Sequence, residues 1–107
     1  MGRAFAIIYD ERVIRRDLAG LDRTILLRVR AAIEKKLVSR PDVYGKPLRG
    51  PLHGIWSLRV GEYRIAYRIV KQAVYIDVIE HRSVIYAIAL SRYNAKKPPN
   101  IELGITS

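Results

Sequence analysis

Three consecutive stretches of alternating residues constrain what this chain can fold into. They occupy residues 55–60, 63–70 and 73–79 and read IWSLRV, YRIAYRIV and AVYIDVI. Alternation of this kind, rich in β-branched and aromatic residues, is typical of strands. Only Gly61-Glu62 and Lys71-Gln72 separate the stretches, and connections this short join antiparallel neighbours. A three-stranded meander is therefore predicted, with Gly61 suited to its turn and a bulge as one way to accommodate Lys71-Gln72.

The flanking segments predict the elements that pack against this sheet. Residues 3–9 indicate a first strand, and a short helix follows from Asp10 to Gly20. Apolar residues spaced by three and four predict a longer helix over residues 23–38. A last helix is expected over residues 82–93. We therefore expect a single α+β domain over residues 1–93, ordered β-α-α-β-β-β-α with an antiparallel sheet packed on helices, and a C-terminal tail over 94–107.

Alternation also sorts the meander into two faces. One set is almost wholly apolar and is expected to pack on the helices: Trp56, Leu58, Val60, Tyr63, Ile65, Tyr67, Ile69, Val74, Ile76 and Val78. The other set carries three arginines: Ser57, Arg59, Arg64, Ala66, Arg68, Tyr75, Asp77, Ile79 and His81.

The predicted turn places Arg59 directly opposite Arg64. Like charges facing each other across two strands are unfavourable, so folding alone gives no reason for the pair. A phosphate between them would turn repulsion into binding, because guanidinium groups grip phosphate bidentately. The alternative is a solvated face on which the repulsion is screened.

Composition narrows the classes of function. The formal net charge is +10 over 107 residues, which exceeds the roughly 2–8 that solubility alone requires of a small domain. A polyanion or an acidic protein is the expected partner. The absence of cysteine and the presence of only two histidines exclude thiolate and histidine-rich metal sites. No apolar run is long enough to cross a bilayer, so a soluble, cytoplasmic protein without membrane association, metal or cofactor is expected.

A longer pattern connects these residues. It comprises KPLRG at 46–50, IWSLRVGEYRIAYRI at 55–69, and His81-Arg82 with Tyr86 four residues beyond Arg82. The pattern resembles the RelE/ParE superfamily of type II toxins, most closely the RelE-like branch, and covers about residues 3–93. The resemblance implies the RelE-like microbial RNase toxin fold.

The resemblance also implies a function. RelE-like toxins are ribosome-dependent mRNA interferases that cut mRNA in the A site without a metal, by attack of a ribose 2′-hydroxyl on the adjacent phosphate. A cognate antitoxin neutralises them, so the implied partners are an antitoxin, the ribosome and mRNA. The alternative from the same superfamily is a ParE-like inhibitor of DNA gyrase that catalyses nothing. A degenerate toxin that retains only its regulatory role is a third interpretation.

The reaction implied by the resemblance needs an acid, a base and cations around the phosphate. Arg64 matches the family's phosphate-binding arginine, Arg82 a basic residue near the leaving group, and Tyr86 the closing tyrosine. His81 is a candidate acid or base because its ordinary pKa is close to neutrality. Tyr86 has the alternative of packing in the core, and His81 that of bonding to Glu80 or the backbone.

Ser57 departs from the family pattern, which commonly has a basic residue at that position. A serine supplies no charge, so Arg59, Arg49 or Lys46 would have to compensate. We expect four residues to bind RNA phosphates: Lys46, Arg49, Arg59 and Arg68.

Overall fold

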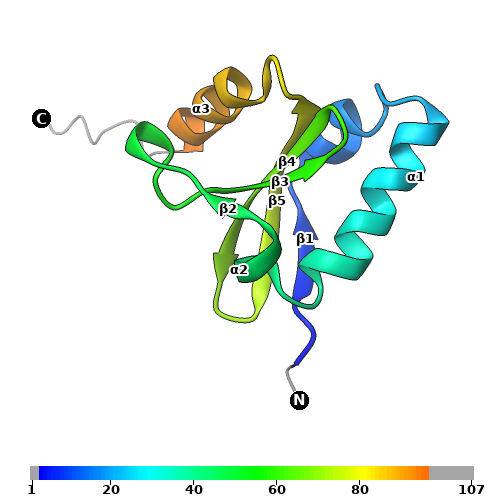
Figure 1. The fold of residues 1–107 in the computed structure, drawn as a ribbon. Coiled ribbons are helices and arrows are strands. Elements are labelled where there is room, and N and C mark those ends of the chain that lie inside the picture. The colour runs from blue at the N-terminus through cyan, green and yellow to red at the C-terminus, as the bar shows by residue number, and fades with distance from the viewer. Residues whose placement is uncertain (1–2, 97–107) are drawn as a thin grey trace, which may run out of the picture.

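The computed structural model describes residues 3–96 as a five-stranded sheet with helices on both faces (Figure 1). The sheet order is β1-β5-β4-β3-β2. Its strands are β1 (Ala6–Tyr9), β2 (Lys46–Pro47), β3 (Trp56–Val60), β4 (Tyr63–Val70) and β5 (Ala73–His81). The α-helices are α1 (Arg23–Ala32), α2 (Pro41–Tyr44) and α3 (Ile85–Lys96), and the other helical turns are η1 (Val13–Asp17), η2 (Ile33–Leu37) and η3 (Gly50–Leu52). The α+β class and the three-stranded meander are confirmed.

Both hairpins of the meander close with two-residue turns, since Val60 pairs with Tyr63 and Val70 with Ala73. Lys71 enters the left-handed region with a φ of 54°, which lets it form a tight turn without a bulge. The irregularity lies farther along the ladder. Ala66 pairs with Val78 and Tyr67 with Ile76, which leaves Asp77 as the extra residue of a β-bulge.

The sheet is mixed, so the prediction of an antiparallel sheet is wrong for its first strand. β1 pairs with β5 in parallel, with Ala6 opposite Ala73 and Tyr9 opposite Ile76. Parallel strands need a long connection between them. The helical segments that follow β1 provide part of it, because they take the chain from one edge of the sheet to the other. Residues 42–54 have no periodicity in the sequence and no strand is predicted there, yet they contain β2, which pairs with the start of β3.

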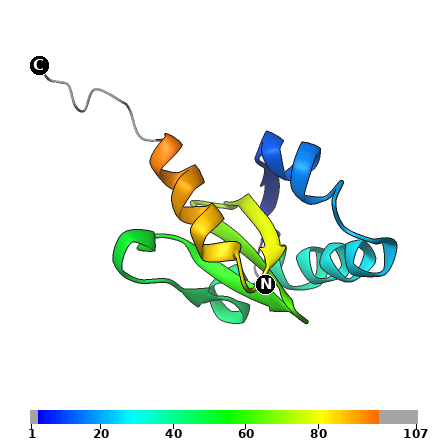
Figure 2. The same cartoon turned by 90° about the horizontal axis from the view of Figure 1, so that it is seen from above.

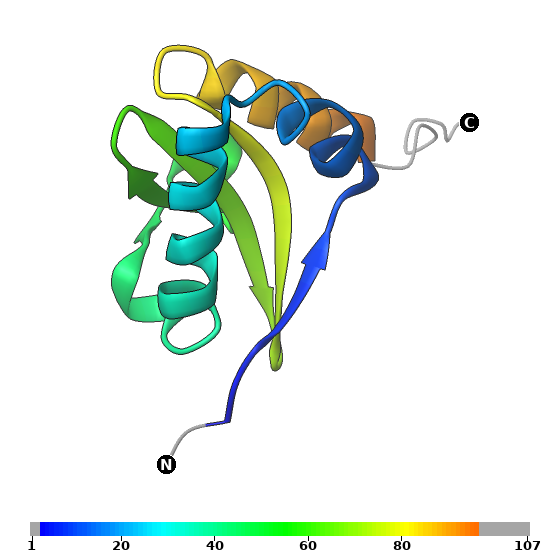
Figure 3. The same ribbon diagram turned by 90° about the vertical axis from the view of Figure 1, so that its right-hand side faces the viewer.

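One face of the sheet packs on α1, η1 and η2 (Figure 3). The predicted helix over 23–38 is α1 continued by the wider turn of η2, in which Val38 N–H donates to the Ile33 carbonyl. Asp22 caps α1 by accepting a hydrogen bond from the Ile25 N–H. The core on this side is formed by Val13, Val29, Ile33, Leu37, Leu58, Val60, Ile65, Tyr67, Val74, Ile76 and Ile79.

The opposite face packs on α3, which lies across the strands on the other side from α1 (Figure 2). Ile85 is fully buried and contributes to a smaller core with Ile55, Ala66, Val78 and Ala89. α3 begins three residues later than predicted and continues to Lys96. The expected start of the tail at residue 94 therefore falls within the helix, and residues 97–107 lie outside the described part of the chain.

A buried ion pair joins the first helical turn to the last helix. The Arg92 guanidinium donates to both carboxylate oxygens of Asp17, at 2.8 and 2.9 Å, and to the Asp77 carbonyl at 2.9 Å. Asp17 also accepts a hydrogen bond from the Ile79 N–H at 2.8 Å. β1 pairs with β5 only as far as Ile76, so the Ile79 N–H has no β1 carbonyl opposite it. The Asp17 carboxylate accepts the hydrogen bond from this N–H instead.

Replacement of Asp17 by alanine should lower the free energy of unfolding by about 3–5 kcal/mol, because Arg92 would stay buried without its counter-ion. Glu11→Ala is the matched control, since Glu11 pairs with Arg15 on the exposed surface and should cost no more than about 0.5 kcal/mol. Urea unfolding of the two variants measures the difference. Equal losses would show that the buried pair does not hold the fold.

Gly45 lies where α2 approaches the sheet. Tyr67 reaches across to donate a hydrogen bond from its hydroxyl to the Pro41 carbonyl at 2.6 Å. Burial, with a smaller contribution from Asp42, raises the pKa of this hydroxyl well above its usual range. A Cβ at Gly45 would overlap the Tyr67 hydroxyl. Glycine is therefore required by the close approach, and this contact fixes the start of β2.

Gly45→Ala should destabilise the protein by about 1–3 kcal/mol, the usual cost of overpacking. The control is Gly20→Ala, whose added Cβ would meet its nearest neighbour, the Arg16 carbonyl oxygen, at an ordinary 3.4 Å. That variant should be neutral or more stable by up to about 1 kcal/mol. Thermal unfolding compares the two, and equal melting temperatures would contradict the steric argument.

Candidate nucleic-acid interface

An open groove of about 320 Å³ lies on the α3 side of the sheet. It is bounded by β2, β3, β4 and the first turn of α3. Three of its lining residues are basic and none is acidic, which suits a polyanionic ligand. We refer to it as the basic groove, and its lining residues are Tyr44, Lys46, Leu48, Ser57, Arg59, Arg64 and Tyr86.

Strand register brings the groove's cations together. Arg59 pairs with Arg64 across the β3–β4 hairpin, which confirms the predicted like-charge pair. Lys46 pairs with Ser57 across β2 and β3, and directly opposite residues share one face of a sheet. Lys46 therefore supplies a positive charge beside Ser57, which itself is buried.

Arg64 is held by the turn that precedes it. Its Nη1 donates to the Gly61 and Tyr63 carbonyls, each at 2.9 Å, and the side chain is half-buried. These bonds use only one of the guanidinium nitrogens. The backbone thus fixes the position of Arg64 while other N–H donors remain on the guanidinium.

Two tyrosines flank the cations. Tyr86 is 46% exposed and Tyr44 is 52% exposed, so Tyr86 lines the groove and does not pack in the core. Lys36 Nζ lies 5.8 Å from the centre of the Tyr44 ring. Exposed aromatic rings beside basic residues are a platform on which single-stranded bases stack. Sequence reasoning missed Tyr44 and Leu48, although an aromatic residue next to Gly45-Lys46 is a signal for such a platform.

Arg82 lies beyond the end of β5, next to the β3–β4 turn. Its Nε donates to the Glu62 carboxylate at 2.7 Å, and its backbone N–H donates to the Glu62 carbonyl at 2.8 Å. Glu62 was not among the predicted site residues. The hydrogen bond from Arg82 and the nearby charges of Arg82, His81 and Arg64 lower the pKa of Glu62.

His81 lies on the other face of the sheet, so the predicted face of this residue is wrong. It pairs with Tyr63, and its ring meets the Tyr63 ring edge-on at 5.6 Å between centroids. The reason is the bulge at Asp77, which shifts the alternation of β5 by one residue. The same shift exchanges the predicted faces of Val78 and Ile79. His81 Nδ1 is hydrogen bonded within the turn to Ser83.

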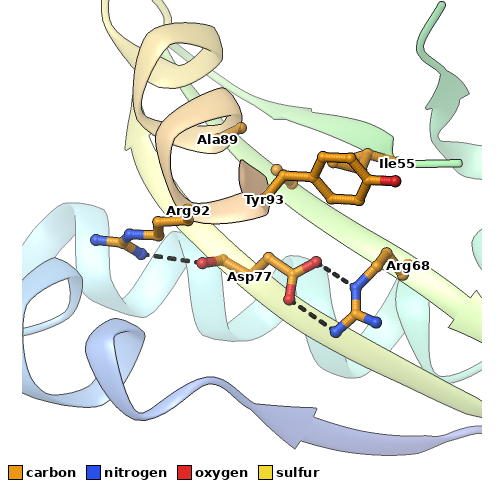
Figure 4. Close-up of a pocket in the computed structure, with 7 residues that line it drawn as sticks. Ile55, Arg68, Asp77, Ala89, Arg92 and Tyr93 are labelled. Atoms are coloured by element: carbon orange, nitrogen blue, oxygen red, sulfur yellow. Dashed lines mark hydrogen bonds and ion pairs between the residues drawn. The ribbon is translucent and has the colours of Figure 1, made fainter. Parts of the chain in front are cut away.

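Arg68 is separate from the basic groove and lines a small cavity under α3, together with Arg92 and Tyr93 (Figure 4). Its guanidinium donates two hydrogen bonds to the Asp77 carboxylate, at 2.7 and 3.1 Å. The hydrogen bond to Asp77 raises the pKa of Arg68. Arg49, also predicted to bind RNA, is exposed in the loop before η3 and does not line the groove.

Within residues 3–96 no three histidine, cysteine or acidic residues cluster so as to hold a metal ion. No helix in this described part of the chain is long and apolar enough to cross a membrane.

Comparison with known proteins identifies relatives. No family model matches the chain. Toxin RelG of Mycobacterium tuberculosis is 42% identical over 74 residues, which are 67% of this chain and 85% of the relative. The structure is similar to the toxin–antitoxin complex RelBE2 of M. tuberculosis, with 34% identity, a TM-score of 0.71 and coverage of 78% of this chain and 97% of that one. A mutant of Escherichia coli toxin RelE in the free state shares the fold, with 21% identity, a TM-score of 0.65, and coverage of 83% and 97%. The chain therefore belongs to the RelE family of toxins.

Proposed function

We propose that this toxin is an endoribonuclease that cleaves mRNA in the ribosomal A site. The basic groove is the observation that carries the proposal, because it combines three cations, two exposed tyrosines and no acidic lining residue. Such a groove favours a single-stranded RNA whose phosphates meet the cations and whose bases stack on the rings. Ribosomes would place its action in the cytoplasm.

The proposed reaction is attack of a ribose 2′-oxygen on the adjacent phosphorus. The new 2′-O–P bond forms as the P–O5′ bond breaks, which leaves a 2′,3′-cyclic phosphate and a 5′-hydroxyl. A base takes the 2′-hydroxyl proton, and an acid protonates the departing 5′-oxygen. Negative charge gathers on the phosphoryl oxygens, where preorganised cations stabilise the transition state.

The structure supports specific residues for these roles. Arg64 is the phosphate-binding cation, since the turn carbonyls already orient it. Tyr86 and Lys46 line the same groove and are the proposed proton-transfer groups. His81, a candidate from the sequence, is on the opposite sheet face, so we assign it no part in proton transfer.

The remaining predicted cations take supporting roles in this proposal. Arg59 faces Arg64 within the groove and would bind a neighbouring phosphate. Arg82 does not line the groove; next to the β3–β4 turn, where it pairs with Glu62, it would contact the leaving group. Arg49 and Arg68 lie outside the groove, so we propose that RNA contacts of Arg49 involve the ribosome and that Arg68 stabilises β5 through Asp77.

An antitoxin is the second proposed partner. Structures of relatives include toxin–antitoxin complexes from M. tuberculosis and from Methanococcus jannaschii. A net charge of +10 favours an acidic partner. We infer a type II toxin–antitoxin pair in which an antitoxin with acidic side chains covers the basic groove and excludes RNA.

A ParE-like inhibitor of gyrase is the alternative function. Ser57 in place of the basic residue common in the RelE-like branch, together with the displacement of His81 from the groove, favours it. A pure inhibitor needs no oriented phosphate site. Cleavage of mRNA therefore separates the two functions.

Arg64→Ala should reduce ribosome-dependent cleavage by about 10²–10³-fold, because it removes a preorganised donor to the transition state. Mapping of mRNA ends after incubation with purified ribosomes measures the loss. Arg30→Gln is the control, since Arg30 pairs with Glu34 on the exposed face of α1 and should retain activity. Growth arrest by the unaltered chain without mRNA cleavage would support gyrase inhibition instead.

Tyr86→Phe and His81→Gln should differ in the same cleavage assay. Loss of the Tyr86 hydroxyl should slow cleavage by about 10²-fold or more, the usual contribution of an acid or base. His81→Gln should leave the rate within about threefold, because the ring lies against Tyr63 on the other face. A collapse of activity in His81→Gln with unchanged stability would return His81 to the list of proton-transfer groups.

A further inference from the structure

The two-residue turn Gly61-Glu62 contacts two of the arginines that the proposed reaction uses, Arg64 and Arg82. Its Gly61 carbonyl accepts from Arg64 at 2.9 Å, and its Glu62 carboxylate accepts from Arg82 Nε at 2.7 Å. Arg64 is orientated by neutral carbonyls, which do not compete electrostatically with a phosphate. Arg82 is instead paired with a full negative charge.

The negative charge of the Glu62 carboxylate lies close to Arg82, His81 and Arg64. Its backbone carbonyl accepts a hydrogen bond from the Arg82 N–H at 2.8 Å, so backbone and side chain hold the two residues together. The charges of Arg82, His81 and Arg64 all act on its carboxylate. A carboxylate paired with a guanidinium occupies donors that a phosphate would otherwise use.

We propose that Glu62 is an intramolecular substitute for phosphate that occupies Arg82 in the free toxin and competes with RNA for it. The carboxylate occupies Nε, so an RNA phosphate must displace it to bind Arg82 bidentately through Nε. The pair is solvent-exposed, at 59% for Arg82 and 62% for Glu62, so the restraint is weak and reversible. Glu62 thereby lowers affinity for RNA in general, so that further contacts in the ribosome are needed to engage Arg82.

The inference rests on the proposed function only in that RNA phosphate is the ligand. Its test uses a short fluorescein-labelled RNA with 2′-O-methyl groups on every ribose, which cannot be cleaved by 2′-hydroxyl attack. Fluorescence anisotropy at low salt gives Kd for the unaltered chain, Glu62→Gln, Arg82→Ala and the double variant. Glu34→Gln is the matched control, because it removes the same charge from an exposed pair on the α1 side.

Glu62→Gln should tighten binding by about two- to fivefold, the range that an exposed ion pair permits. Glu34→Gln should change Kd much less. In the Arg82→Ala background the gain from Glu62→Gln should disappear, since no guanidinium remains to be released.

Three results would overturn the proposal: weaker binding by Glu62→Gln, an equal gain from Glu34→Gln or in the Arg82→Ala background, or no binding of this RNA by the unaltered chain. Thermal unfolding checks that each variant is folded. Because the probe cannot be cleaved, the predicted gain together with absent ribosomal cleavage would reject the nuclease function and leave the role of Glu62 intact.

Discussion

The extra residue at Asp77 in β5 is the constraint on which both faces of the sheet depend. It shifts the alternation by one position, so that Val78 packs under α3 while Ile79 joins the core under α1. Its carbonyl accepts from Arg92, which pairs with Asp17. The same bulge therefore helps to position α3, and through Arg92 it links η1 to β5.

The bulge also decides the chemistry available in the basic groove. It turns His81 toward Tyr63, so Lys46 and Tyr86, which line the groove, are the residues proposed for proton transfer. β2 brings Lys46 opposite Ser57, so a cation on the edge strand lies beside the position at which β3 has no basic residue. One of the groove's three cations thus comes from an edge strand, whose place depends on the close approach of Gly45 to Tyr67.

Sequence patterns predicted what depends on local geometry. Period-two alternation defined the three strands, a two-residue turn fixed Arg59 opposite Arg64, and apolar spacing defined the helix that begins at Arg23. The pairing of β1 with β5 was beyond such reasoning, because parallel partners lie far apart in the sequence. Tyr44 was missed because the short segment around it has no periodicity and is ordered only by contacts with the sheet.

The sequence by itself determined the class of fold, the excess of positive charge and the cluster of arginines on one sheet face, since these follow from local periodicity and composition. Only the tertiary structure decided which cations share a groove and which are neutralised. Arg68 and Asp77 meet across two strands, and Arg82 meets Glu62 across two turns. Strand register and a single inserted residue set those pairings, and neither is encoded in the spacing of residues along one strand.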